Sequence, residues 1–268
     1  MMWTRKELKE RAKEALKRNY WKIVLVSLIG VLISGGLSSS GFSNNVSDKV
    51  SQNAQNYYSA GNITEIEKTV INMENNGDFD ITPGFIASLA FAGIVVLIIV
   101  VIGLAIGIAL DVLLMNPIQV GINRFMVKSL DDTARIAEVG YTFDHNYKNG
   151  VKVMFFKDLY VILWSLLFVI PGIYKAYQYR MVPYILGENP DMTYQEVLQR
   201  SKDMMEGHKW NTFVLDLSFI LWHILGGITC GLAEIFYVAP YVNLTDAALY
   251  SRLNQKNQDA QPVLETTV

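Results

Sequence analysis

The sequence has very few residues of the kinds that build disulfides or metal sites. It contains one cysteine in 268 residues, Cys230, and its three histidines lie far apart, at His145, His208 and His223. One cysteine excludes a disulfide framework and a cysteine-based zinc site, and the scattered histidines indicate no metal site. The P-loop, dinucleotide-binding, HExxH and GxSxG motifs are absent. We therefore expect no cofactor, no metal, no catalytic residue and no nucleic-acid partner.

Charge is missing from one long stretch of the chain. Residues 85–110 hold no charged side chain over 26 residues, within a chain that is 51% hydrophobic. An α-helix of this length extends about 39 Å, which exceeds the roughly 30 Å of a bilayer's hydrocarbon core. Buried helices of soluble proteins seldom run beyond roughly 20 residues. The stretch therefore predicts a transmembrane helix and an integral membrane protein.

Two later apolar segments, residues 151–187 and 210–250, are expected to fold as helical hairpins. Pro171-Gly172 predicts the turn of the earlier hairpin, because this pair is a strong turn signal. The glycine-rich residues 226–231 predict the turn of the later one. With a first span near residues 21–41 and a second at 85–117, the hairpins bring the chain to six crossings.

The distribution of Lys and Arg predicts the orientation of these crossings. The loops before the first span, after the second, between the hairpins and at the C-terminus hold 8, 5, 3 and 2 Lys/Arg, whereas residues 42–84 hold two, with six acids. Basic loops remain in the cytosol, so six crossings place every basic loop and both termini there. Four crossings, with each hairpin counted as one bent helix, would leave residues 191–210 outside.

These features predict an all-α polytopic membrane protein with about six transmembrane helices in three hairpins and with interfacial amphipathic helices. The expected segments are a basic amphipathic interfacial helix (1–20), a first hairpin (21–123) with an extracytoplasmic loop (42–84), a cytosolic connector (124–150), a second hairpin (151–187), an interfacial helix (188–209), a third hairpin (210–250) and a disordered tail (251–268).

The N-terminal basic segment has the pattern of a surface helix. Thr4 followed by Glu7 forms a capping-box pattern, and a narrow apolar stripe runs along residues 4–18, at Leu8, Ala12, Ala15 and Leu16. A strongly basic helix with such a stripe is typical of helices that lie on anionic membrane surfaces. The alternative is a solvated helix that only sets the orientation of the first span.

The chain also contains an internal repeat. Thr4, Glu7 and Trp21 recur at one constant offset as Thr193, Glu196 and Trp210, and Asp158-Leu159 recurs as Asp216-Leu217. The pattern indicates three hairpins, each followed by a proline and an interfacial helix. Such repeats occur in transporters, with sites at repeat interfaces, although packing economy or chance similarity between apolar helices explains them as well.

Seven polar residues in or beside apolar segments are candidates for a functional or structural role: Asp111, Asp158, Lys175, Arg180, Asp216, His223 and Glu234. Intramembrane ionisable groups need a partner, a watery cavity or protonation. The four acids either pair with interfacial cations or serve a transport pathway. The cationic, tyrosine-rich arm around Lys175 and Arg180 either contacts lipid phosphate or extends its charges to the interface.

His223 and Glu234 are expected to form a pair. A fold between Ile228 and Thr229 brings the two positions to the same depth on opposing arms of the last hairpin. A hydrogen bond between imidazole and carboxylate would satisfy both groups, either as a structural clasp or as a proton relay. A separate pattern, Gly103-x-x-x-Gly107, allows close helix packing and self-association.

Nearly the whole chain, except the 42–84 loop and the tail, resembles a bacterial family of integral membrane proteins catalogued as domain of unknown function 975, most specifically in residues 154–250. The resemblance rests on the Tyr20-Trp21 end of the basic helix, on LWSLLFVIPGIYKAYQYRMVPYIL, on SKDMMEGHKW and on FVLDLSFILWHILGGITCGL. It implies a bacterial inner membrane location and a multi-pass helical fold, and it carries over no catalytic residue. More distantly, the architecture is similar to the membrane domain attached to some glycerophosphodiester phosphodiesterases.

Three classes of function follow from this sequence. We expect a non-enzymatic accessory, scaffold or lipid-interacting factor of the cell envelope, because a basic cytosolic face accompanies a membrane fold without a catalytic set. Its expected partners are membrane lipids, anionic ones among them, and a second copy or another protein in the membrane. The alternative is a small transporter or permease that uses intramembrane acids. The third option, an intramembrane lipid-acting enzyme, rests on the distant resemblance and the cationic arm.

Overall fold

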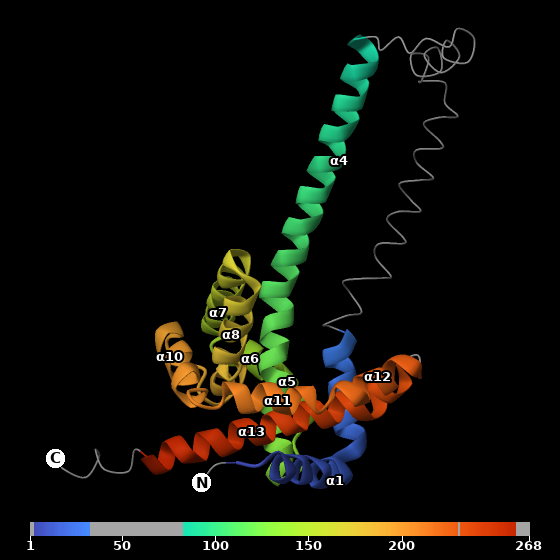
Figure 1. Cartoon of the computed structure of the whole chain (residues 1–268). Coiled ribbons are helices and arrows are strands. Elements are labelled where there is room, and N and C mark those ends of the chain that lie inside the picture. The colour runs from blue at the N-terminus through green and yellow to red at the C-terminus, as the bar shows by residue number, and fades with distance from the viewer. Residues whose placement is uncertain (1–2, 33–82, 230, 261–268) are drawn as a thin grey trace, which may run out of the picture. The chain divides into compact units, whose positions relative to one another are not determined.

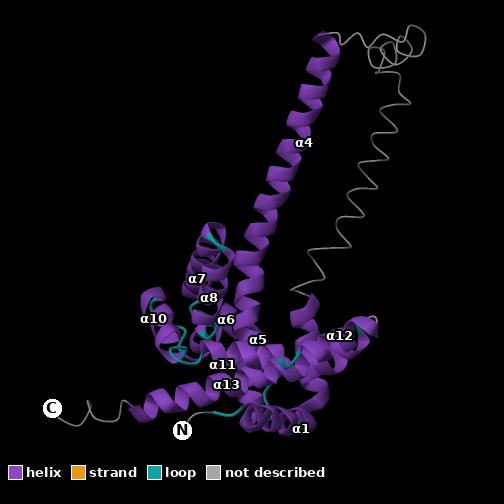
Figure 2. Ribbon diagram, in the orientation of Figure 1, coloured by secondary structure: helices purple, strands orange, loops and turns teal. Residues whose placement is uncertain are grey.

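The computed structural model describes residues 3–32, 83–229 and 231–260, and all regular structure in these ranges is helical (Figures 1 and 2). The chain divides into two units, residues 35–110 and the remainder. Described elements of the larger unit are α1 (Arg5–Val31), the π-helix η2 (Asp111–Met115), α5 (Asn116–Asp131), the 3-10 helix η3 (Ile136–Gly140), α6 (Tyr141–Asp144), α7 (Tyr147–Leu167), α8 (Val169–Gln178), α9 (Val182–Glu188), α10 (Tyr194–Met204), α11 (Lys209–Leu217), α12 (Ile220–Ile228), the π-helix η4 (Glu234–Val238) and α13 (Ala239–Ala260).

The smaller unit contributes one described helix, α4 (Pro83–Leu110), of 28 residues without a charged side chain. Two helical stretches of the described residues are long and apolar enough to cross a membrane, Ala90–Asp131 and Lys209–Ile228. A membrane location is consistent with both. The count of six spans stays a prediction, as does the loop at 42–84, of which residues 42–82 lie outside the described ranges.

Helix α1 is kinked close to the residue at which the first span is expected to begin. Asn19 departs from helical geometry, with φ −128° and ψ 31°. At this kink Arg18 donates hydrogen bonds to the carbonyls of Ser129 and Leu130, at 3.0 and 2.7 Å. The last carbonyls of a helix have no partner within it, so Arg18 satisfies the C-terminal turn of α5. The kink is thus fixed by the helix against which α1 packs.

The apolar stripe of α1 packs into the protein instead of facing lipid. Leu8, Ala12, Ala15 and Leu16 are at most 5% exposed and belong to the main hydrophobic cluster. Helix α1 lies beside α13 and α5, and α13 contributes buried alanines to the same cluster (Figure 1). Small residues let helices approach closely. The expectation that the stripe rests on a membrane surface is therefore wrong.

The second hairpin turns earlier than the Pro-Gly pair suggested. Helix α7 ends at Leu167, Phe168 is extended (φ −157°, ψ 144°), and α8 begins at Val169. Pro171 and Gly172 therefore lie in the first turn of α8. Proline is tolerated there because the first amides of a helix have no intrahelical acceptor.

The third hairpin turns where the glycines predicted. Gly231 has φ +86°, and its amide donates to the carbonyl of Gly226 at 2.8 Å, which closes the end of α12. Cys230, within this turn, lies outside the described residues. A break at Ser218-Phe219, which the pattern did not predict, divides the first arm into α11 and α12.

Helix α13 corrects the expected tail. It continues to Ala260, through half of the segment 251–268 that was expected to be disordered, and Leu253 is buried in the core. The sequence there is polar because one side of the helix faces solvent. Residues 261–268 lie outside the described ranges.

Both hairpins present exposed apolar side chains. Leu166 and Ile170 near the α7–α8 turn are 83% and 81% exposed, and Leu221 and Ile228 of α12 are 77% and 75% exposed. Exposed apolar surface of this kind marks a membrane or protein contact. Helix α8, with 10 residues, extends about 15 Å, which is half of a roughly 30 Å hydrocarbon core.

Gly172 tests the packing of the second hairpin. A Cβ atom there would lie 2.7 Å from Cα of Ser165 and still closer to its hydroxyl oxygen. We expect Gly172→Ala to destabilise the protein by about 1–3 kcal/mol, the usual cost of overpacking. Gly227→Ala is the control, because nothing lies within 4 Å of its Cβ position. Equilibrium unfolding in mixed micelles measures both, and a Gly172→Ala protein as stable as Gly227→Ala would contradict the close approach.

Candidate functional site

Arg180 joins three elements through two carboxylates. It follows α8, and its guanidinium donates to both oxygens of Asp216 in α11, at 2.6 and 2.9 Å. It also donates to both oxygens of Asp246 in α13, at 2.8 and 2.9 Å. The hydroxyl of Tyr177 donates to Asp216 at 2.7 Å. We call these four residues the Arg180 cluster.

The Arg180 cluster is largely shielded from solvent. The exposed fractions of the Arg180, Asp216 and Asp246 side chains are 21%, 31% and 17%. A guanidinium has five donors in a fixed plane and matches carboxylates in a bidentate manner. Two carboxylates on one cation leave one formal negative charge, which the Tyr177 hydroxyl partly stabilises. The arrangement therefore ties the second hairpin to both arms of the third.

Sequence reasoning found part of this cluster. It singled out Arg180 and Asp216, which the structure brings together, and it missed Asp246. The missing signal was available, because Asp246 is an acid inside the apolar stretch Leu244–Leu249. Lys175, expected to act with Arg180, lies apart from the cluster, with its ammonium 5.2 Å from the ring centre of Trp164.

Asp158 has polar partners at the start of the second hairpin. Its carboxylate accepts from the Asn116 amide at 2.9 Å and lies 2.9 Å from the ammonium of Lys157. Asp111 begins η2 and is exposed, and no hydrogen bond or ion pair engages it in the described part of the chain. Of the two acids, Asp158 fits the structural interpretation.

His223 and Glu234 face each other across the third hairpin, as predicted. Nδ1 of His223 lies 3.2 Å from Oε2 of Glu234. The imidazole is 49% exposed and the carboxylate 29% exposed, on a part of the hairpin that is otherwise apolar. Within the described ranges, no group of three or more His, Cys, Asp or Glu is placed to hold a metal ion.

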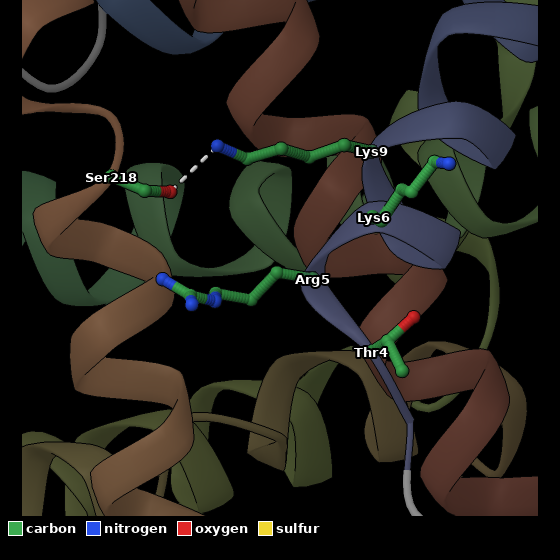
Figure 3. Close-up of a pocket in the computed structure, with 5 residues that line it drawn as sticks. All are labelled: Thr4, Arg5, Lys6, Lys9 and Ser218. Atoms are coloured by element: carbon green, nitrogen blue, oxygen red, sulfur yellow. Dashed lines mark hydrogen bonds between the residues drawn. The ribbon is translucent and has the colours of Figure 1, made fainter.

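A basic hollow beside the start of α1 was not predicted. It has a volume of about 420 Å³, and its lining comprises Thr4, Arg5, Lys6, Lys9 and Ser218 (Figure 3). The ammonium of Lys9 donates to the Ser218 hydroxyl at 2.6 Å and lies 4.2 Å from the ring centre of Phe219. Burial, together with nearby Arg5 and Lys13, lowers the pKa of Lys9. The signal in the sequence is a row of cations four residues apart, at positions 5, 9 and 13.

Comparison with known proteins identifies a family. The family model described as "Protein of unknown function (DUF975)" matches residues 1–257. No curated protein and no solved structure matches the chain. The match covers the Arg180 cluster, the basic hollow and the His223–Glu234 pair.

The Arg180 cluster predicts a large loss of stability when the cation is removed. Arg180→Met leaves two shielded carboxylates without a counter-ion, so we expect a loss of about 3–5 kcal/mol. Lys175→Met, on the same hairpin arm, should cost only about 1 kcal/mol because it removes cation–π contacts with Trp164 and Tyr179 and no ion pair. Equilibrium unfolding in mixed micelles compares the two. Equal losses of stability in the two variants would show that the ion pairs of the Arg180 cluster stabilise the protein no more than the contacts of Lys175 do.

The His223–Glu234 pair predicts non-additive mutations. His223→Leu and Glu234→Leu should each destabilise the protein, and the double variant should be milder than their sum by about 0.5–3 kcal/mol. Glu234→Leu combined with His145→Leu is the control. The His145 ring stacks on Tyr141, with ring centres 4.0 Å apart, and not on Glu234, so the effects of these two changes should add. Thermal unfolding in detergent measures the set. Strict additivity in the first pair would mean that the two groups are not coupled.

Proposed function

The chain belongs to the family described as proteins of unknown function DUF975, and from its site geometry we propose that it is a non-enzymatic scaffold or lipid-interacting factor of the bacterial inner membrane. It is a multi-pass protein in this proposal, with about six transmembrane helices and both termini in the cytosol. The hairpins enter from the cytosolic side and return to it, which leaves every basic loop on that side.

One observation carries the proposal, namely that the Arg180 cluster holds its acids with several bonds each. Asp216 accepts three hydrogen bonds, two from Arg180 and one from Tyr177. An acid that binds a transported ion has to exchange its partner during each cycle, whereas a scaffold gains from a permanent one. Asp158 and Glu234 also have partners within hydrogen-bond distance. These acids thus connect neighbouring helices through hydrogen bonds and ion pairs.

The exposed apolar side chains of the two hairpins support the proposed scaffold or lipid-interacting function. Leu166, Ile170, Leu221 and Ile228 enlarge the surface that contacts lipid or another membrane protein. The GxxxG pattern at Gly103 and Gly107 adds a route to self-association, because no atom lies within 4 Å of either Cβ position. A scaffold of this kind recruits lipids or partners through its surface.

The second candidate is a small transporter or permease. It is favoured by the negative charge that two carboxylates leave in the Arg180 cluster and by the exposed Asp111. An intramembrane enzyme that acts on lipid is the third option, and it rests on the distant resemblance to the membrane domain of glycerophosphodiester phosphodiesterases and on the cationic arm.

Variants of Asp111 and Asp216 distinguish a scaffold from a transporter. A scaffold should complement a deletion strain with Asp111→Asn and lose stability with Asp216→Asn, whereas a transporter should lose complementation with either variant while Asp111→Asn leaves the fold intact.

Sidedness is the most direct prediction of this proposal. In a Cys230→Ser background, Gln195→Cys and Lys256→Cys should react with a membrane-impermeant maleimide only in inverted vesicles, because both positions follow hairpins that return to the cytosol. Detergent-solubilised protein controls for reactivity of the thiols. Labelling of position 195 in intact cells would rule out the proposed topology.

A further inference from the structure

The basic hollow of α1 has a defined geometry. Arg5 lies in the first turn of α1 and Lys9 in the next, and both side chains reach toward the segment that carries Ser218, whereas Lys6 points away (Figure 3). The hydrogen bond from Lys9 to Ser218 joins residues 209 positions apart in the sequence. Ser218 in turn donates to the Leu215 carbonyl at 2.5 Å, so its hydroxyl is held in place. Ser218 therefore positions the ammonium of Lys9.

Two of the cations that line the hollow, Arg5 and Lys9, have no balancing carboxylate among the residues that the structure describes. Glu7 pairs with Arg252 at 3.0 Å, and Glu10 lies 3.9 Å from Lys6. Within the described ranges, neither Arg5 nor Lys9 has a carboxylate at ion-pair distance. Like charges four residues apart on a helix repel each other and destabilise it. An arrangement that costs stability and holds two cations beside an open hollow of about 420 Å³ is suited to an anion.

We propose that Arg5 and Lys9 bind the phosphate group of an anionic phospholipid headgroup. This inference rests on the proposed function, which it deepens by assigning a site and a ligand class. The guanidinium of Arg5 matches two phosphate oxygens, and Lys9 supplies a point charge and its remaining donors. The positive end of the dipole of α1, a helix of 27 residues whose Glu7 amide is capped by Thr4, adds favourable partial charge.

The surroundings of the hollow favour a lipid as the source of the phosphate. A second hollow, of about 430 Å³, adjoins the first at Arg5 and is also lined by Trp210 and Val214. Trp210 is 71% exposed, and tryptophan is enriched at the headgroup level of membranes. Exposed apolar residues follow along α11 and α12, among them Leu217 and Leu221. The phosphate would lie against α1 while the acyl chains follow this apolar side.

The test uses the full chain purified in neutral detergent with added phosphatidylglycerol. Because a ligand that binds the native state raises the unfolding temperature, phosphatidylglycerol should raise Tm more than phosphatidylcholine at the same mole fraction. Arg5→Gln with Lys9→Gln should weaken the apparent affinity for phosphatidylglycerol at least about tenfold, because charge-assisted hydrogen bonds are lost. The single variant Arg5→Gln replaces an exposed side chain, so it retains the fold and gives the same direction of change.

The matched control removes the same charge elsewhere. Lys17→Gln with Lys202→Gln replaces two exposed lysines, on α1 and α10, and should retain the wild-type response. Equal responses of the two double variants would overturn the site and leave the proposed function standing. A stabilisation by inorganic phosphate as large as that by the lipid would overturn the lipid source. A wild-type protein with no preference for phosphatidylglycerol would overturn the inference, and the maleimide labelling tests the proposed topology independently.

Discussion

A guanidinium group inside a mostly apolar protein needs acceptors close by, and Arg180 finds them in two carboxylates that come from different helices. Asp216 is carried by α11 and Asp246 by α13, so one side chain draws together both arms of the third hairpin and the end of the second. The energy of such an ion pair is a balance between desolvation and attraction. The geometry of the ion pairs is more restrictive than their energy, because a planar guanidinium binds two carboxylates in few arrangements. The relative placement of the two hairpins follows from that demand.

The repeating pattern of the sequence looks different once these partners are known. Asp158 and Asp216 occupy equivalent places in the sequence repeat, yet Asp158 binds Asn116 and Lys157 while Asp216 binds Arg180 and Tyr177. The N-caps are more alike, since Thr4 accepts from the amide of Glu7 and Thr193 from that of Glu196. Local signals of the repeat are thus similar, whereas its tertiary partners differ. The equivalent positions of the pattern therefore make different contacts in the core.

The all-helical fold and the apolar segments could be predicted because they depend on composition and local turn signals. The turn at Gly231 was predictable for the same reason, since a positive φ favours glycine. Pro171 misled because a proline serves equally in a turn and in the first turn of a helix. The stripe of α1 misled because lipid and a neighbouring helix both accept an apolar face. The two alanines of the stripe, Ala12 and Ala15, favoured a neighbouring helix over lipid as the contact, because small residues let helices approach closely. Single residues such as Asp246 can be singled out from the sequence, but no local pattern shows which distant residues pair, as Lys9 does with Ser218 and Arg180 with Asp246.

The packing of α1 on α13 has a consequence for how the protein is made. Arg11 donates to Ser251 across 240 residues of sequence, and Glu7 pairs with Arg252. Helix α1 therefore acquires these contacts with α13 only after the chain between them, about 240 residues, has been synthesised. Until then the α1 stripe of alanine and leucine lacks the part of its cover that α13 supplies, and contacts of such sequence separation form slowly. The packing of α13 on α1 is therefore a late step in the folding of this protein.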